Sequence, residues 1–150
     1  MKLARIGKRG SEVPAVLDRD GVHRDVSSLV SDFTPEFFAG DGNERLRSSD
    51  LSALPAVEGR IGAPIARPSL ILCVGLNYVD HANESSMKVP EEPILFTKAP
   101  NCLVGPYDEV LTPRGATTVD YEVELAVVIG RQCRYLESPE QAMEHLAGFT

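Results

Sequence analysis

The amino-acid sequence predicts a β-rich α+β protein, on three observations. Short apolar runs recur along the chain, and prolines and glycines separate them, as expected of short strands joined by turns. Helix signals are confined to segments near residues 34–49, 77–86 and 138–148. Of the 150 residues, 43 % are hydrophobic and 25 % are charged, so the composition is that of a globular protein long enough for one core.

The chain begins with a pattern of short strands. Residues 2–6, 13–17 and 22–26 are apolar or alternating runs, and Asp18-Arg-Asp-Gly21 has the composition of a turn. Together they predict a small β-meander that contains a hairpin.

A helical stretch is expected next. Thr34 has the side chain of an N-cap, Pro35 suits the first helical position, and serines at 48 and 49 follow. Residues 54–68 then hold three prolines and two glycines, which predicts a connector rather than a helix or strand. We therefore expect residues 1–67 to form a small N-terminal α+β domain.

Residues 68–150 are expected to begin a second domain. An apolar strand at 70–74 is closed by Gly75, and a helix or helical turn follows at 77–86. Frequent prolines in the next stretch leave room only for short strands, of which 94–97 and 109–111 are the candidates.

The end of the chain carries the clearest strand and the clearest helix start. Residues 122–129 form an almost continuous β-prone run. Ser138 as N-cap, Pro139 at the first helical position and Gly148 as a stop predict a helix over residues 138–148. Residues 149–150 then have the pattern of a strand entry.

Charge and cysteine content exclude several classes of protein. A net charge of -7 and a pI near 4.9 argue against a nucleic-acid binder, which would show a basic patch. No apolar run reaches the ~18 residues of a membrane span and no signal-peptide core is visible, so we expect a cytoplasmic protein without membrane contact. Cys73, Cys102 and Cys133 lack metal-site spacing and are read as reduced, with Cys73 a buried apolar residue.

Glu122 and Glu124 are candidate metal ligands. Strand alternation puts both carboxylates on one face, and two like charges that close favour a shared cation. Oxygen ligands select a hard ion, Mg²⁺ or Mn²⁺, with Ca²⁺ as a further candidate. The structural alternative is that this end of the strand is exposed to solvent and the glutamates form its solvent-exposed face.

His81 and Glu84 are candidate catalytic residues. They lie three positions apart, so on a helix they share one side, and the carboxylate can orient the imidazole as a general base for water. The alternative is a surface histidine in a polar helix. Lys98, at the end of a short strand, can offer a positive charge to a substrate carboxylate or enolate, or can simply be solvated.

The order of these motifs resembles the fumarylacetoacetate hydrolase family, most closely its sugar-acid branch of 2,4-diketo-3-deoxy-fuconate or -rhamnonate hydrolases and proteins often labelled ureidoglycolate lyases. The resemblance rests on Gly75-Leu-Asn-Tyr78, His81-x-x-Glu84, Pro93-Ile-Leu-Phe-Thr-Lys98 and Asp120-Tyr-Glu-Val-Glu-Leu-Ala-Val-Val-Ile-Gly130. It is strong over residues 68–150, and residues 1–67 resemble the small N-terminal domain of many bacterial members.

The resemblance implies a mixed-sheet pseudo-barrel, incomplete in this chain, that assembles as a homodimer. It implies a Mg²⁺ or Mn²⁺ site in which Glu122 and Glu124 match two of three carboxylate ligands, and a water-activating dyad of His81 and Glu84. The third ligand would follow Thr150, so we expect this sequence to be the N-terminal piece of a longer protein.

Three functions are compatible with these residues. The leading hypothesis is an enzyme that hydrolyses a carbon–carbon bond of a 2,4-diketo acid, giving pyruvate and a second acid, with a small keto acid as its partner. A second is decarboxylation of a 2-keto acid such as oxaloacetate, or isomerisation of an unsaturated one, which also exploits a metal-stabilised enolate. A third is a non-catalytic module of the same fold.

Overall fold

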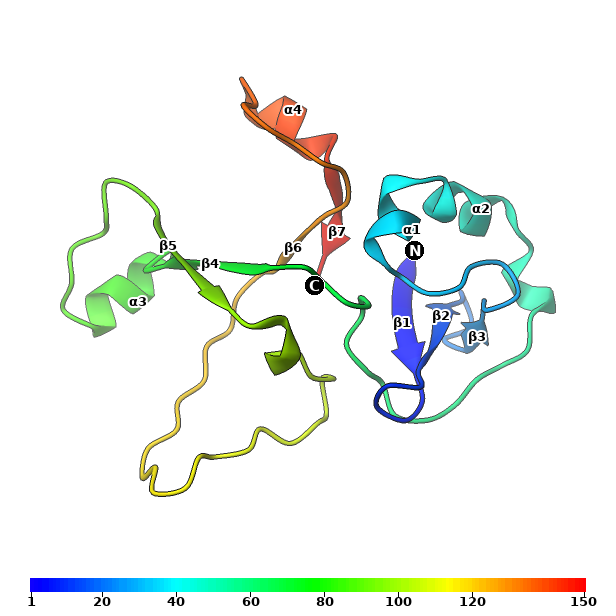
Figure 1. Ribbon diagram of the computed structural model, residues 1–150, viewed down its shortest axis with the longest axis horizontal. Helices are drawn as coiled ribbons and strands as arrows, with labels where there is room; N and C mark the ends of the chain where they lie inside the picture. The colour runs from blue at the N-terminus through cyan, green and yellow to red at the C-terminus, as the bar shows by residue number, and fades with distance from the viewer. The chain divides into compact units, whose positions relative to one another are not determined.

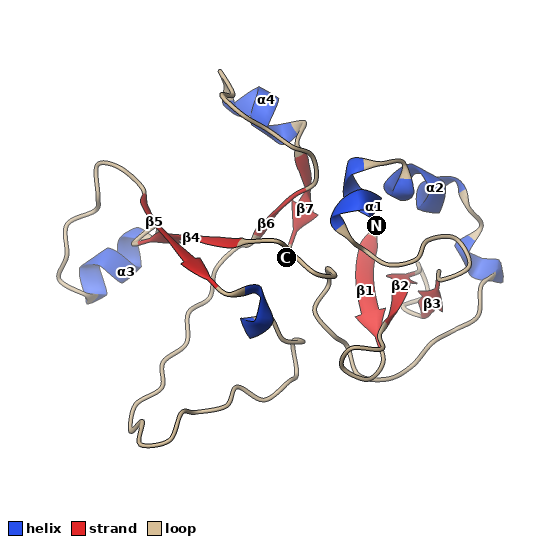
Figure 2. Ribbon diagram, in the orientation of Figure 1, coloured by secondary structure: helices blue, strands red, loops and turns tan.

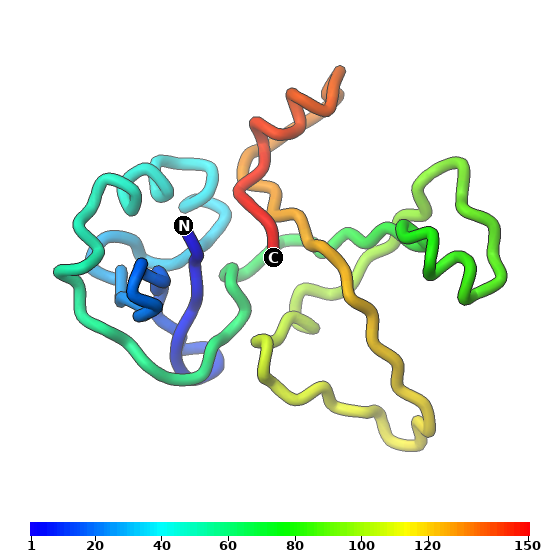
Figure 3. The backbone as a smooth tube through the Cα atoms, turned by 180° about the vertical axis from the view of Figure 1, so that it is seen from behind, coloured from blue at the N-terminus to red at the C-terminus, as the bar shows by residue number.

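The computed structural model describes every residue from Met1 to Thr150. The chain separates into two compact units, of which the first joins Met1–Ala66 to Val104–Thr150 and the second is Arg67–Leu103. Figure 1 labels the helices and strands, and Figure 3 traces the backbone from the opposite side. No helix has the length and apolar character that crossing a membrane requires.

The N-terminal sheet is the predicted meander. Strands β1 (Lys2–Ile6), β2 (Val13–Leu17) and β3 (His23–Asp25) pair antiparallel in the order β1-β2-β3. At the turn between β2 and β3, one carboxylate oxygen of Asp18 accepts hydrogen bonds from the backbone N–H groups of Asp20 and Val22, both at 2.9 Å. An aspartate that bonds its own backbone in this way favours a tight turn, which confirms the predicted hairpin.

Two short helices follow and cover the apolar core beside the N-terminal sheet. Helix α1 (Pro35–Ala39) begins at Thr34, whose hydroxyl accepts from the Phe37 N–H at 3.5 Å, as the sequence predicts. Helix α2 is Gly42–Ser48, and the 3-10 turn η1 is Leu51–Ala53. The core beneath them is apolar and well buried, and its members are Val16, Val26, Val30, Phe33, Phe37 and Leu46.

The second unit is a hairpin with a helix inserted between its strands. Strands β4 (Ile71–Gly75) and β5 (Ile94–Lys98) pair antiparallel, and α3 (Val79–Glu84) lies between them in the chain, followed by the 3-10 turn η2 (Pro100–Cys102) after β5. All three predicted elements are confirmed, although α3 is shorter than residues 77–86. The expectation that Cys73 is buried is wrong, because its side chain is half-exposed on β4.

The last part of the chain is less regular than predicted. Strands β6 (Val127–Ile129) and β7 (Leu146–Phe149) pair antiparallel with a bulge between Val128 and Ile129, and α4 is Pro139–Met143. The three sheets of the chain are separate and none is closed (Figure 2).

Three sequence-based predictions are wrong here. Residues 109–111 form no strand, because no segment of the chain pairs with them. The strand predicted over 122–129 is regular only from Val127, and its ladder with β7 extends to Ala126 opposite Thr150. The helix predicted over 138–148 ends at Met143, because the backbone from Leu146 onward pairs with β6 instead.

Candidate functional site

The candidate catalytic dyad lies on α3. His81 is half-exposed and Glu84 is exposed, and their spacing places both on one side of the helix. Ala82 is fully buried and anchors the opposite side, which leaves the dyad side facing outward. Leu76, between β4 and α3, adopts φ +52°, a left-handed conformation that is unusual for a bulky residue and turns the chain sharply from strand to helix.

Lys98 lies in the same unit but at the other end of the hairpin. It pairs with Ile71, whereas α3 follows Gly75, which pairs with Ile94 at the opposite end. At ~3.3 Å per strand residue, the backbone of Lys98 is about 13 Å along the strand from Ile94. The hairpin therefore separates Lys98 from the start of α3, and its substrate-binding role stays a prediction.

Glu122 and Glu124 lie in the first unit, on the extended segment that leads into β6. Both side chains are exposed. The backbone at this point is irregular, and the neighbouring side chains of Tyr121 and Val123 are each 84 % exposed. The segment thus exposes its acidic and its apolar side chains alike.

The carboxylates of Glu122 and Glu124 suit a hard cation but are too few to hold it alone. Carboxylate oxygens are the ligands that Mg²⁺ and Mn²⁺ prefer, and no histidine or thiol lies between them. The chain brings together no group of three or more histidine, cysteine, aspartate or glutamate side chains placed to hold a metal ion. The two glutamates are consequently a partial ligand set.

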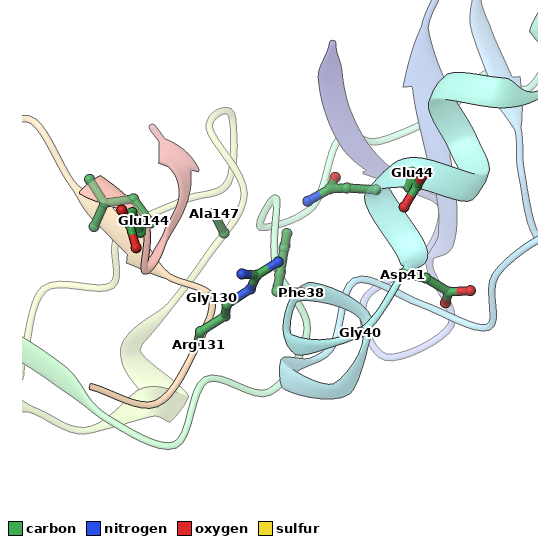
Figure 4. Close-up of a pocket in the computed structure, with 10 residues that line it drawn as sticks. Phe38, Gly40, Asp41, Glu44, Gly130, Arg131, Glu144 and Ala147 are labelled. Atoms are coloured by element: carbon green, nitrogen blue, oxygen red, sulfur yellow. The ribbon is translucent and has the colours of Figure 1, made fainter. Parts of the chain in front are cut away.

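A shallow pocket of about 200 Å³ occurs in the first unit, and none of the predicted site residues lines it. Its lining includes Asp41, Glu44, Arg131 and Glu144, whose side chains are drawn in Figure 4. Since polar surface predominates in its lining and the pocket is open to solvent, it does not resemble the concave, largely apolar sites that bind small organic ligands.

One charged pair was not singled out by the sequence. Arg60 binds both carboxylate oxygens of Asp108, although the two residues are 48 positions apart. The local signals are an arginine in a connector and an aspartate after a proline-rich stretch, and neither indicates a partner. Glycines at 62 and 105, which permit a close approach of the two backbones, are the only clue in the sequence.

Residues 70–150 match the family described as fumarylacetoacetate (FAA) hydrolase C-terminal. A 2,4-didehydro-3-deoxy-L-rhamnonate hydrolase of Sphingomonas sp. (strain SKA58) is 44 % identical over 151 residues, which is 99 % of this chain and 51 % of that protein. The solved structure of a fumarylacetoacetate hydrolase from psychrophilic Exiguobacterium antarcticum superposes with a TM-score of 0.76 at 35 % identity, over 99 % of this chain and 53 % of that one.

These comparisons confirm the predicted fold class, a β-rich α+β chain that forms part of a mixed-sheet fold. The chain spans about half the length of the curated relatives it matches. The boundary after residue 67 stays a prediction.

Proposed function

The chain belongs to the fumarylacetoacetate hydrolase family, and from this premise we propose that it forms the first part of a metal-dependent hydrolase that cleaves a carbon–carbon bond of a 2,4-diketo acid. The products would be pyruvate and a second acid. The observation that carries the proposal is the 44 % identity, over nearly the whole chain, to a hydrolase of a didehydro-deoxy sugar acid. That likeness favours a deoxy-diketo sugar acid over a simple acylpyruvate.

His81 and Glu84 would supply the water chemistry. Their shared position on the outward side of α3 supports this role, since an imidazole oriented by a carboxylate can take a proton from water near neutral pH. The hydroxide then adds to the distal carbonyl carbon of the substrate. The carbon–carbon bond breaks with its electron pair moving to the pyruvate portion, and His81 returns a proton.

Glu122 and Glu124 would provide two ligands for Mg²⁺ or Mn²⁺. When bound, the cation would neutralise the 2-keto acid end of the substrate and the negative charge that develops there. Lys98 is proposed as a contact for a substrate carboxylate. Completing the ligand set requires a further oxygen ligand, which we propose lies beyond Thr150 in the full-length gene product.

A substrate screen tests the proposal. The full-length gene product, with Mg²⁺ or Mn²⁺, is offered acylpyruvates, oxaloacetate and deoxy-diketo sugar acids. Release of pyruvate with a second acid is expected. Release of CO₂ from oxaloacetate as the main reaction would favour the decarboxylase, and the absence of turnover with every substrate would favour a non-catalytic module.

We also propose a homodimer located in the cytoplasm. Sedimentation of the full-length gene product would test the dimer. A single species at the monomer mass at micromolar concentration would contradict it.

A further inference from the structure

Arg60 connects the N-terminal domain to the segment that follows the second unit. Its guanidinium donates from Nε to Asp108 Oδ1 at 2.6 Å and also reaches Asp108 Oδ2. Its remaining nitrogen donates to Glu12 Oε1 at 2.9 Å and to the carbonyl oxygen of Gly7 at 3.2 Å. A planar guanidinium suits such two-point binding of a carboxylate, and lysine cannot reproduce it.

The turn that carries Asp108 is pressed against the backbone beside Arg60. A Cβ added to Gly105 would lie 2.2 Å from the carbonyl oxygen of Ile61 and 3.1 Å from the Cα of Gly62, so only glycine fits there. The N–H of Gly105 donates to Asp108 Oδ2 at 2.7 Å, which closes the turn. We call Glu12, Arg60, Ile61 and Gly62 the notch, and residues 105–108 the docked turn.

Burial makes these charges depend on one another. Only 6 % of the Glu12 side chain and 17 % of that of Asp108 are exposed, so removing Arg60 would take the same cation from two largely buried carboxylates. The hydrogen bonds from Arg60, followed by the one from the Gly105 N–H, lower the pKa of Asp108 to about 2. The turn is therefore held by both shape and charge.

The docked turn lies at the start of the stretch that carries the two glutamates. Residues 109–125 form no helix or strand, and the next fixed point is the pair of backbone hydrogen bonds between Ala126 and Thr150. With both ends held, this stretch is a closed loop, which has fewer conformations to lose when its side chains gather around a ligand.

We propose that Arg60 is a positioning residue for Glu122 and Glu124: by docking the turn in the notch, it holds the upstream end of the stretch that brings these carboxylates to their cation. The inference rests on the proposed function for the cation itself. The docking of the turn can be measured by hydrogen exchange in the absence of any cation.

The first measurement is hydrogen exchange of the Gly105 amide in the full-length gene product. Arg60→Gln and Asp108→Asn should each speed this exchange at least tenfold. Arg24→Gln is the matched control, because Arg24 forms a similar ion pair with Asp18 at 2.7 Å, away from the docked turn. The Val26 amide, which donates to the Pro14 carbonyl at 3.0 Å and lies outside the notch, reports whether the N-terminal sheet is intact. Unchanged exchange at Gly105 in both variants would overturn the docking.

The second measurement is the Kd for Mn²⁺ alone, in the full-length gene product. Arg60→Gln should weaken Mn²⁺ binding about tenfold, Arg60→Lys should recover part of the loss, and Arg24→Gln should change nothing. Faster Gly105 exchange with an unchanged Kd would overturn the positioning role and leave the proposed function standing. A wild-type protein that binds no Mn²⁺ would overturn both, whereas the exchange data would still show the turn docked.

Discussion

Ala126 and Thr150 exchange two backbone hydrogen bonds, of 2.8 and 2.9 Å, and so hold the end of the glutamate-bearing segment beside the last residue of the chain. Thr150→Pro removes one N–H donor from this pair. One backbone hydrogen bond contributes about 1 kcal/mol, so exchange of the Ala126 amide should become about fivefold faster. Thr150→Val, which keeps the N–H, should leave the exchange rate unchanged.

His81 should be needed for turnover but not for binding of the metal ion. His81→Ala in the full-length gene product removes the proposed general base, and kcat for a diketo acid should fall about 10²- to 10⁴-fold, the usual contribution of such a group. The Kd for Mn²⁺ should stay within twofold of the wild-type value. A variant with wild-type kcat would contradict the assignment of the base.

Glu122 should be needed both for metal binding and for turnover. Glu122→Ala removes one of the two proposed ligands, so Mn²⁺ binding and turnover should be lost together. Glu109→Ala is the control, because Glu109 is also an exposed glutamate in the irregular stretch before β6. Retention of Mn²⁺ binding and activity in Glu122→Ala would contradict the proposed metal site.

Local signals predicted the starts of elements well, and distant pairing decided their ends. Thr34 and Ser138 cap α1 and α4 with their own side chains, an interaction within three residues that the sequence displays directly. The end of α4 depends instead on pairing between Ile129 and Leu146, which competes with continuation of the helix. The helix propensities of residues 138–148 do not reveal that strand pairing competes with the helix there.

The candidate site shows the same division. The three-residue spacing of His81 and Glu84 and the alternation of Glu122 and Glu124 are local, so sequence patterns could identify both pairs. The bond between Arg60 and Asp108 joins two segments that only the fold brings together, and so the sequence could not predict it.

Gly42 is expected to be required at the junction of α1 and α2. An added Cβ would lie 2.2 Å from a ring carbon of Phe37 and 2.8 Å from its carbonyl oxygen, and Phe37 is buried in the core. Alanine favours a helix over glycine by at most about 1 kcal/mol, whereas overpacking a core costs about 1–3 kcal/mol. Gly42→Ala should therefore lower the free energy of unfolding in urea. Gly148→Ala, where nothing lies within 4 Å, should change it by less than about 0.5 kcal/mol.

Acid should release the docked turn in a defined pH range. The pKa of Asp108 is about 2 in the folded chain, against an ordinary value of 3.8 that applies when the chain is unfolded. A carboxyl group whose pKa is lowered by folding stabilises the fold fully above its unfolded pKa, and that contribution disappears as the pH falls through the folded pKa. The free energy of unfolding of the wild type should exceed that of Asp108→Asn by a constant amount above pH ~5, and the difference should shrink between pH ~4 and ~2. Measuring both proteins in urea at each pH removes the acid sensitivity that they share. A difference that stays constant down to pH ~2 would show that Asp108 keeps an ordinary pKa and that Arg60 does not hold its charge.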